Sequence, residues 1–144
     1  MYKHILVPTD GSALSRRAIA TAVTLAAEEH AKVTGLYVAD IMSLATVETN
    51  PRQLARDMAQ AQSTARWNLG EVEQAARAAG VECETFFEEE NRSVPDAIAH
   101  ITEQRQCDLV VMGTNARHGL AAMLRPSNAK EVAKYLSVPV LVVH

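Results

Sequence analysis

The chain has 144 residues, of which 48% are hydrophobic and 22% charged, and its formal net charge is −3. This profile is typical of one globular domain with a single core, and the acidic balance argues against a nucleic-acid-binding protein, which usually carries a basic excess. No apolar run approaches the about 18 residues of a membrane span, and Pro8 interrupts the N-terminus before any apolar leader can form, so we expect a single cytoplasmic domain over residues 1–144 that contacts no membrane.

The chain opens with a predicted strand, a turn and a helix. Residues 3 to 8 form an apolar run rich in β-formers, which should end at Pro8 because proline cannot donate a ladder hydrogen bond. Asp10-Gly11-Ser12 predicts a turn in which Ser12 caps the next helix. That helix is expected over Ala13 to Glu29, where apolar residues recur at helical spacing.

A second strand and a long helix follow. Val33 to Val38 reads as a strand, and residues 39 to 50 have no clear period and predict a loop. Pro51 begins a helix that Gly80 ends. One continuous apolar stripe runs along this helix. Its members are Leu54, Met58, Ala61, Ala65, Leu69, Val72 and Ala76.

The second half of the chain predicts three more strands. Val81 to Phe87 alternates with Glu82 and Glu84, which indicates one exposed face and an edge position. Ser93-Val94-Pro95-Asp96 resembles a capping box that begins a helix. Leu109 to Met112 suits a strand buried on both faces, and a last helix leads to a fifth strand over Val138 to Val143.

Strands that alternate with helices predict an α/β fold with a parallel sheet and right-handed crossovers. We expect a single-domain, three-layer, Rossmann-like sandwich whose five strands have the order 3-2-1-4-5. Ligands of such sheets lie beyond the carboxyl ends of the strands, where the strand order reverses. This rule brings Pro8, Thr9, Asp10 and Gly113 to one crevice.

The segment from Asp108 to Val132 carries a pattern of its own. A strand is followed by a turn-rich stretch with Gly113 and Gly119, and then by Ser127-Asn128 at the start of a helix. Backbone N–H groups gather around an anion in this order of elements. An anion-binding loop is therefore expected here.

The chain resembles the universal stress protein family over its whole length, from Lys3-His4-Ile5-Leu6-Val7-Pro8-Thr9-Asp10-Gly11-Ser12 to Val138-Pro139-Val140-Leu141-Val142-Val143. Members of that family carry Gly-x-x-Gly after a strand, a nine-residue spacer, and Gly-Ser or Gly-Thr. Gly113 and Ser127 stand at matching places in this chain. Ala116 and Pro126 stand where the second and third glycines of the family would be.

The resemblance implies ATP or AMP as the ligand, with Mg as an ion that could accompany it. Asp10 would accept a hydrogen bond from a ribose hydroxyl, the Val38 backbone would meet the adenine edge, and Met112 would pack on the base. The phosphates would face donors of Gly113 and the following loop. By position the resemblance implies Pro8, Thr9, Asp10, Val38, Met112, Gly113, Ser127 and Asn128 as site residues. Arg117 and Gly119, in the turn-rich loop after Gly113, complete the candidate site.

The two departures from the family pattern weaken the expected phosphate contacts. Pro126 has no N–H, and losing one hydrogen bond to a charged group costs about 1.5–3 kcal/mol. Ala116 adds a Cβ, which costs about 1–2 kcal/mol more if that position needs a positive φ. Together these changes lower affinity by roughly two to four orders of magnitude. Arg117, His118 and Arg125 could compensate as side-chain donors, or they form a solvated basic loop.

Four of the site residues also have a purely structural interpretation. Asp10 could be a turn-forming carboxylate, since Asx turns are common. Gly113 could be needed only for a turn at the end of a strand. Ser127 and Asn128 could cap the last helix, because Asn128 and Glu131 have capping-box spacing.

Other residues predict no chemistry. Cys83 and Cys107 are expected as buried reduced thiols, and the histidines lack the spacing of metal ligands. Glu88-Glu89-Glu90 predicts a solvated turn. Trp67 lies off the apolar stripe of its helix and is either half-exposed or part of a contact with a partner.

No enzymatic turnover is expected. A nucleotide hydrolase would need a general base or a P-loop lysine, and neither is evident. A phospho-accepting receiver domain has a similar strand order but needs Asp at the end of its third strand, where Phe86-Phe87-Glu88 stands. Two interpretations stay open: a nucleotide-responsive protein, and a structural or interaction protein of the same family with an unknown protein partner.

The C-terminal strand is the expected dimer contact. The resemblance implies that Val138 to Val143 pairs with the same strand of a second subunit. An apolar edge strand left bare invites such association. The sequence therefore predicts a homodimer.

Overall fold

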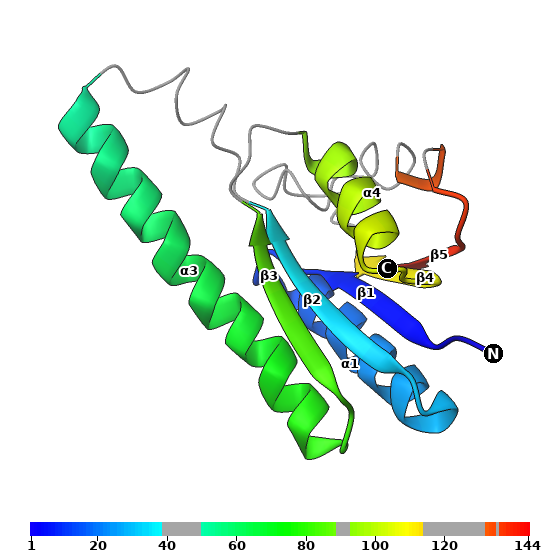
Figure 1. Ribbon diagram of the computed structural model, residues 1–144. Helices are drawn as coiled ribbons and strands as arrows, with labels where there is room; N and C mark the ends of the chain where they lie inside the picture. The colour runs from blue at the N-terminus through cyan, green and yellow to red at the C-terminus, as the bar shows by residue number, and fades with distance from the viewer. Residues whose placement is uncertain (39–49, 89–92, 114–131, 135) are drawn as a thin grey trace.

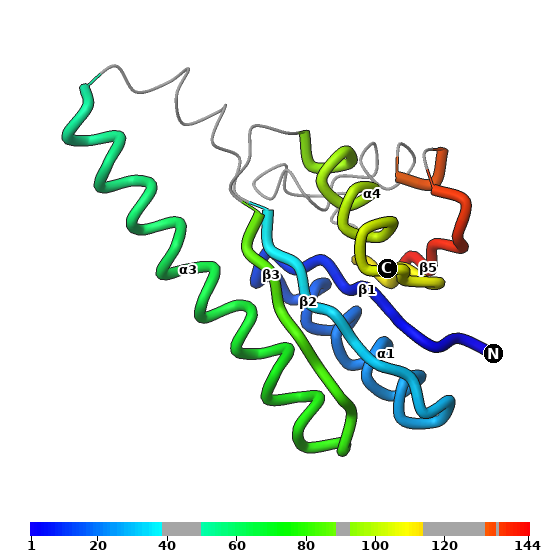
Figure 2. Tube along the Cα trace, viewed as in Figure 1, coloured from blue at the N-terminus to red at the C-terminus, as the bar shows by residue number. Residues whose placement is uncertain are grey.

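A computed structural model describes residues 1–38, 50–88, 93–113, 132–134 and 136–144 of the chain (Figures 1 and 2). The predicted loop over residues 39 to 50, apart from Asn50, and most of the predicted last helix lie outside these ranges. The elements below are those of the described residues.

Five parallel strands form one sheet in the order β3-β2-β1-β4-β5, which confirms the predicted topology. The strands are β1 (His4–Pro8), β2 (Lys32–Val38), β3 (Cys83–Glu88), β4 (Leu109–Gly113) and β5 (Val140–Val143). β4 is buried along its whole length, as its continuous apolar run predicts.

Two strands begin two residues later than the sequence predicts, and local backbone groups explain why. The N–H of Val81 donates to the carbonyl of Ala76 at 2.8 Å and so closes a helix end instead of joining the sheet. Pro139 has no N–H, although its carbonyl still accepts from the Val110 N–H at 3.1 Å. The ladders of β3 and β5 therefore start at Cys83 and Val140.

Helices cover both faces of the sheet, as the three-layer prediction requires (Figure 1). α1 (Ala13–Glu29) and α3 (Pro51–Ala78) pack on one face, and α4 (Val94–Gln104) packs on the other. Val132, in the short helical stretch at residues 132–134, is fully buried in the same core as the inner side chains of α4. Side chains alternate between the two cores along each strand, so β1 contributes Ile5 to one core and Leu6 to the other.

The helix starts follow their capping residues. The Ser12 hydroxyl accepts from the Ser15 N–H at 3.2 Å, and the Ser93 hydroxyl accepts from the Asp96 N–H at 3.3 Å. The Asn50 side chain accepts from the Arg52 N–H at 3.0 Å, ahead of a proline in the first turn of α3. The predicted caps at Ser12 and Ser93 are confirmed.

The apolar stripe of α3 is buried only in its second half, contrary to the prediction of one continuous stripe. Burial begins at Ala65, whereas Leu54, Met58 and Ala61 stay partly exposed. A helix of 28 residues is about 42 Å long, but a strand of six or seven residues covers only about 20 Å. The first turns of α3 consequently extend past the carboxyl ends of the strands (Figure 1).

β3 is an edge strand, as predicted, but the face that carries Glu84 is not simply solvated. The Glu84 carboxylate lies 3.2 Å from Lys32 Nζ and accepts from the Thr34 hydroxyl at 3.2 Å. Burial by itself raises the pKa of Glu84, but the contacts with Lys32 and Thr34 outweigh it and hold the pKa below its ordinary value. On the same face the Arg105 guanidinium stacks on the Phe86 ring, 3.7 Å from its centroid.

Of the helices in the described part of the chain, none combines the length and apolarity that crossing a bilayer demands.

We predict that Gly70→Ala stabilises the protein. A Cβ at Gly70 has no neighbour within 4 Å, and Gly in the middle of a helix is less stable than Ala by about 0.5–1 kcal/mol. The melting temperature should rise by roughly 2–4 °C, as measured by calorimetry.

Gly113→Ala is the matched control and should have the opposite effect. A Cβ at Gly113 would lie 2.8 Å from the Leu14 carbonyl oxygen. Relieving this overlap should cost about 1–3 kcal/mol. Equal melting temperatures for the two variants would contradict the packing described here.

Candidate functional site

β1 and β4 separate at their carboxyl ends. β1 pairs with β2 over five residues, from His4 to Pro8. Its pairing with β4 stops after Ile5 and Leu6, although β4 continues to Gly113. This is the predicted place where the strand order reverses, and it is where α/β sheets usually bind ligands.

Pro8 explains the separation. The His4 N–H donates to Asp108, just before β4, and the Thr9 N–H donates to the Leu36 carbonyl of β2 at 2.8 Å. Since backbone N–H groups alternate sides along a strand, the nitrogen of Pro8 faces β4. Proline offers no hydrogen there, so the ladder to β4 cannot continue.

The loop after β1 is held by side-chain hydrogen bonds. The Thr9 hydroxyl donates to Ser15 Oγ at 3.2 Å and accepts from the Gly11 N–H at 3.3 Å. The Ser15 hydroxyl in turn donates to the Ser12 carbonyl at 2.8 Å. Thr9 is buried and turns its side chain toward the first turn of α1. Both its hydroxyl and its N–H are therefore engaged within the protein.

The Asp10 carboxylate is only half used by the protein. Its Oδ1 accepts from the Ser12 N–H at 2.9 Å, the Asx turn expected from the sequence. Its Oδ2 is buried and has no hydrogen-bond partner among the described residues. A buried carboxylate oxygen without a donor is costly, so this atom is prepared to accept a hydrogen bond.

Asn68 is a site residue that the sequence analysis missed. This amide on α3 is buried at 5% exposure and lies against Gly11, where a Cβ would come within 2.5 Å of Asn68 Oδ1. Gly11 also has a φ of 81°, which other residues rarely adopt. Asn68 therefore leaves no room for a Cβ at residue 11, next to Asp10. Its signal in the sequence is a polar residue at helical spacing within the apolar stripe of α3.

The remaining described site residues lie at the ends of β2 and β4. Val38 ends β2, with its side chain in the core beneath α4, so its backbone is the part available at the sheet edge. Met112 is fully buried in the same core. Gly113 packs against Leu14 of α1, which gives a structural reason for glycine at this position.

Glu88 corrects one expectation from the sequence. It pairs with Val38 as the last residue of β3, and it is buried at 8% exposure instead of lying in a solvated turn. The ladder holds its backbone, and alternation turns its side chain to the α4 face, as for Phe86. A buried carboxylate thus lies at the same sheet edge as Asp10.

Two aromatic rings lie beside this edge. Tyr37 of β2 and Phe87 of β3 stack with their centroids 5.9 Å apart. Burial, together with the nearby charge of Asp10, raises the pKa of Tyr37 above its ordinary value. The charge of Asp10 therefore reaches the Tyr37 hydroxyl.

Four of the candidate site residues lie outside the described residues. These are Arg117, Gly119, Ser127 and Asn128. Ala116 and Pro126, the two departures from the family pattern, lie in the same segment. The structure thus brings together the part of the site built by Pro8, Thr9, Asp10, Val38 and Gly113.

The thiols and Trp67 stand apart from this site. Cys83 is half-buried and Cys107 buried, and both are free. Burial raises the pKa of Cys83 to about 11 and that of Cys107 to about 12, so both stay protonated at neutral pH. Trp67 is 74% exposed, more than expected. Within the described residues, no three His, Cys, Asp or Glu side chains gather in a way that could hold a metal.

Comparison with known proteins gives consistent matches. A model described as the universal stress protein family matches residues 1–144. The chain is 33% identical over 145 residues to Universal stress protein MJ0531 of Methanocaldococcus jannaschii, covering 99% of this chain and 82% of that protein.

Solved structures agree with this match. A protein of the universal stress protein family from Burkholderia pseudomallei has a TM-score of 0.81 and 24% identity, over 99% of this chain and 96% of that one. A universal stress protein in complex with cAMP has a TM-score of 0.69 and 25% identity, over 99% of this chain and 97% of that one.

Asp10→Asn should lower the pKa of Tyr37. The substitution removes the negative charge that disfavours the tyrosinate, while burial keeps the pKa of Tyr37 above its ordinary value of 10.0. Absorbance at alkaline pH measures this titration, and Tyr37→Phe identifies which part of the signal belongs to Tyr37. An unchanged pKa of Tyr37 in Asp10→Asn would show that the charge of Asp10 does not act on the Tyr37 hydroxyl.

Proposed function

Because this chain belongs to the universal stress protein family, we propose that it binds an adenine nucleotide, AMP or ATP, where β1 and β4 separate. It does so as a cytoplasmic homodimer and without turning the nucleotide over. The observation that carries the proposal is the buried, unpartnered Oδ2 of Asp10 at this point of the sheet.

The chemistry of this atom fits a ribose. A ribose hydroxyl is a neutral donor, and a carboxylate oxygen that already lies in a fixed Asx turn can accept from it without rearranging the loop. The Val38 backbone at the end of β2 offers an amide and a carbonyl to a base edge. A similar fold holds cAMP in another family member, which supports an adenine nucleotide as the ligand.

The phosphates would be met by the segment after Gly113. Ser127 and Asn128 would supply the donors that the family resemblance implies, and Arg117 and Gly119 of the same segment would add to them. Mg would accompany ATP as a counter-ion of its phosphates. Arg117 could form a charge-assisted hydrogen bond with a phosphate oxygen. This is the part of the site that Ala116 and Pro126 weaken.

Ala116 and Pro126 favour one alternative, a family member that acts only as a structural or interaction protein. Both residues remove what a phosphate needs from a glycine loop, namely a free N–H and close backbone approach. The two functions differ in a simple observable, which is whether the folded protein is stabilised by nucleotide.

AMP and ATP should each raise the melting temperature of the wild-type protein, with and without Mg. Ligand at about 100 times its Kd adds about 2.7 kcal/mol of stability. In Asp10→Asn the turn keeps its acceptor but the second atom becomes a donor, so affinity should fall by roughly ten- to a hundredfold. Thermal shift and titration calorimetry measure both effects.

Asp57→Asn on the projecting part of α3 is the matched control, since it removes the same charge from a carboxylate that accepts from Gln53 within the described part of the chain. It should bind nucleotide like the wild type. The absence of any shift at millimolar AMP or ATP would leave the structural alternative. If the double variant Ala116→Gly with Pro126→Gly then showed a nucleotide-induced rise in melting temperature, the two substitutions in the loop after Gly113 would account for the missing binding.

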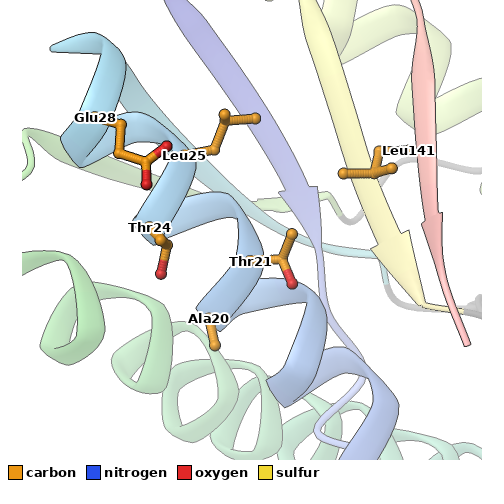
Figure 3. Close-up of a pocket in the computed structure, with 6 residues that line it drawn as sticks. All are labelled: Ala20, Thr21, Thr24, Leu25, Glu28 and Leu141. Atoms are coloured by element: carbon orange, nitrogen blue, oxygen red, sulfur yellow. The ribbon is translucent and has the colours of Figure 1, made fainter.

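The homodimer proposal rests on β5. This strand pairs with β4 on one side, and its Leu141 is 42% exposed. Leu141 and the outer side chains of α1 line a shallow groove of about 420 Å³ (Figure 3). Pairing with β5 of a second copy would satisfy the free edge and cover part of this groove.

Leu141→Asp should convert the dimer into a monomer in light scattering, because it places a charge in the contact. Leu141 tests the interface more specifically than Val140 or Val142. Both valines pack against the core of their own subunit, so a charge there would also destabilise the fold. Gln74→Asp, on an exposed turn of α3, adds the same charge elsewhere and should leave the dimer intact. A dimer that survives Leu141→Asp would remove β5 as the interface.

A further inference from the structure

Each of the three carboxylates of α3 accepts a hydrogen bond on a side of the helix other than the one that is turned away from the sheet. Asp57 accepts from the Gln53 amide at 2.9 Å, and Glu73 accepts from the Thr85 hydroxyl of β3 at 3.0 Å. Glu71 accepts from Arg16 Nε of α1 at 2.7 Å. None of these acids neutralises the side of α3 that is turned away from the sheet.

That outer side carries a row of arginines. Arg56, Arg66 and Arg77 follow Arg52 by 4, 14 and 25 residues, which is close to whole numbers of turns at about 3.6 residues per turn. The row is thus about 37 Å long. All four side chains are exposed, and the ion pairs found among the described residues include none of them. We call this row the arginine face of α3.

Trp67 adds an apolar anchor to the arginine face. It follows Arg66 directly and is 74% exposed, an unusual state for the largest apolar side chain. Tryptophan and arginine are the residues most enriched among those that dominate binding energy in protein interfaces. The position of Trp67 therefore indicates where a partner would be held most firmly.

Gly70 lies on the same side of the helix, 18 residues or about five turns after Arg52. Nothing in the fold requires glycine there, because a Cβ would have no neighbour within 4 Å. Glycine destabilises a helix interior relative to alanine. A partner that approaches the helix backbone closely would account for the missing side chain.

We propose that the arginine face of α3 docks an acidic segment of a partner protein, whose carboxylates pair with the arginines and whose apolar side chain covers Trp67. The arginines supply the charge complementarity in a chain that is acidic overall. Arginine also suits carboxylates because its guanidinium can pair with both oxygens.

Other occupants fit this surface less well. Four charges over about 37 Å are sparse beside duplex DNA, which carries one negative charge per about 1.7 Å. A helix that lies in a membrane surface needs a broad apolar face, whereas Trp67 is the one large apolar side chain on this side. Two copies that met through this face would bring arginines against arginines.

Trp67 is the only tryptophan in the chain, so its emission reports on this face directly. The probe is a synthetic acidic helix of about 25 residues, matched to the length of the row, with glutamates and leucines on one side. Binding should shift Trp67 emission to shorter wavelength. The Kd should rise by roughly tenfold when the ionic strength rises from about 0.01 M to about 0.15 M, because salt screens the charge pairs.

The variants separate charge from fold. Arg56→Glu with Arg66→Glu should weaken binding of the probe by about tenfold or more, through repulsion of its glutamates. Arg17→Glu, which reverses an equally exposed charge on α1, should change the Kd less than about twofold. Gly70→Ala should raise the melting temperature and yet weaken binding, a combination that a purely structural role would not produce.

Each of four results would overturn the proposal. The first is an unchanged Trp67 emission in the presence of the acidic helix. The second is equal binding of the same peptide with glutamine in place of glutamate. The third is tighter binding of oligothymidylate or of phosphatidylserine vesicles than of the peptide. The fourth is a change of oligomeric state in Arg56→Glu with Arg66→Glu, which would make the face a contact between copies of this chain.

Discussion

The missing amide hydrogen of Pro8 is the constraint on which the carboxyl edge of this sheet depends. A parallel sheet pairs its strands as long as each backbone can donate to its neighbour. β1 keeps this ability toward β2 through Thr9 and loses it toward β4 at Pro8. The separation of β1 and β4 is therefore built into the backbone chemistry of one residue, and the loop that carries Asp10 begins at that point.

α3 connects this edge to the rest of the surface. Its inner side places Asn68 against Gly11, next to the Asp10 carboxylate, and buries Val72 and Ala76 in the core beneath the sheet. The neighbouring residue Trp67 faces solvent. One helix thus supports the candidate ligand loop from within while it presents a charged and aromatic side to the outside.

Polar groups at the opposite, amino edge of the sheet are arranged differently. His4, Lys32, Thr34 and Glu84 contact one another across three adjacent strands. Burial, followed by the charge of Lys32, lowers the pKa of His4, so its ring is neutral near pH 7. These groups satisfy each other, unlike Asp10 Oδ2. Asp10 Oδ2 at the carboxyl edge is therefore the atom on which the proposed ligand contact rests.

The sequence was enough to predict the order of the elements and the caps at Ser12 and Ser93, because periodicity and capping are local properties of the chain. The parallel sheet and its strand order followed from the alternation of strands with helices, through the rules for crossover connections. The sequence also identified Asp10 as a turn residue at the end of the first strand. The packed structure was needed to show which oxygen of Asp10 the turn uses, that Asn68 lies against Gly11, that Glu88 is buried and that half of the α3 stripe extends beyond the sheet. Each of these depends on distances between segments far apart in the chain, and on the lengths of helices relative to strands, which no local pattern encodes.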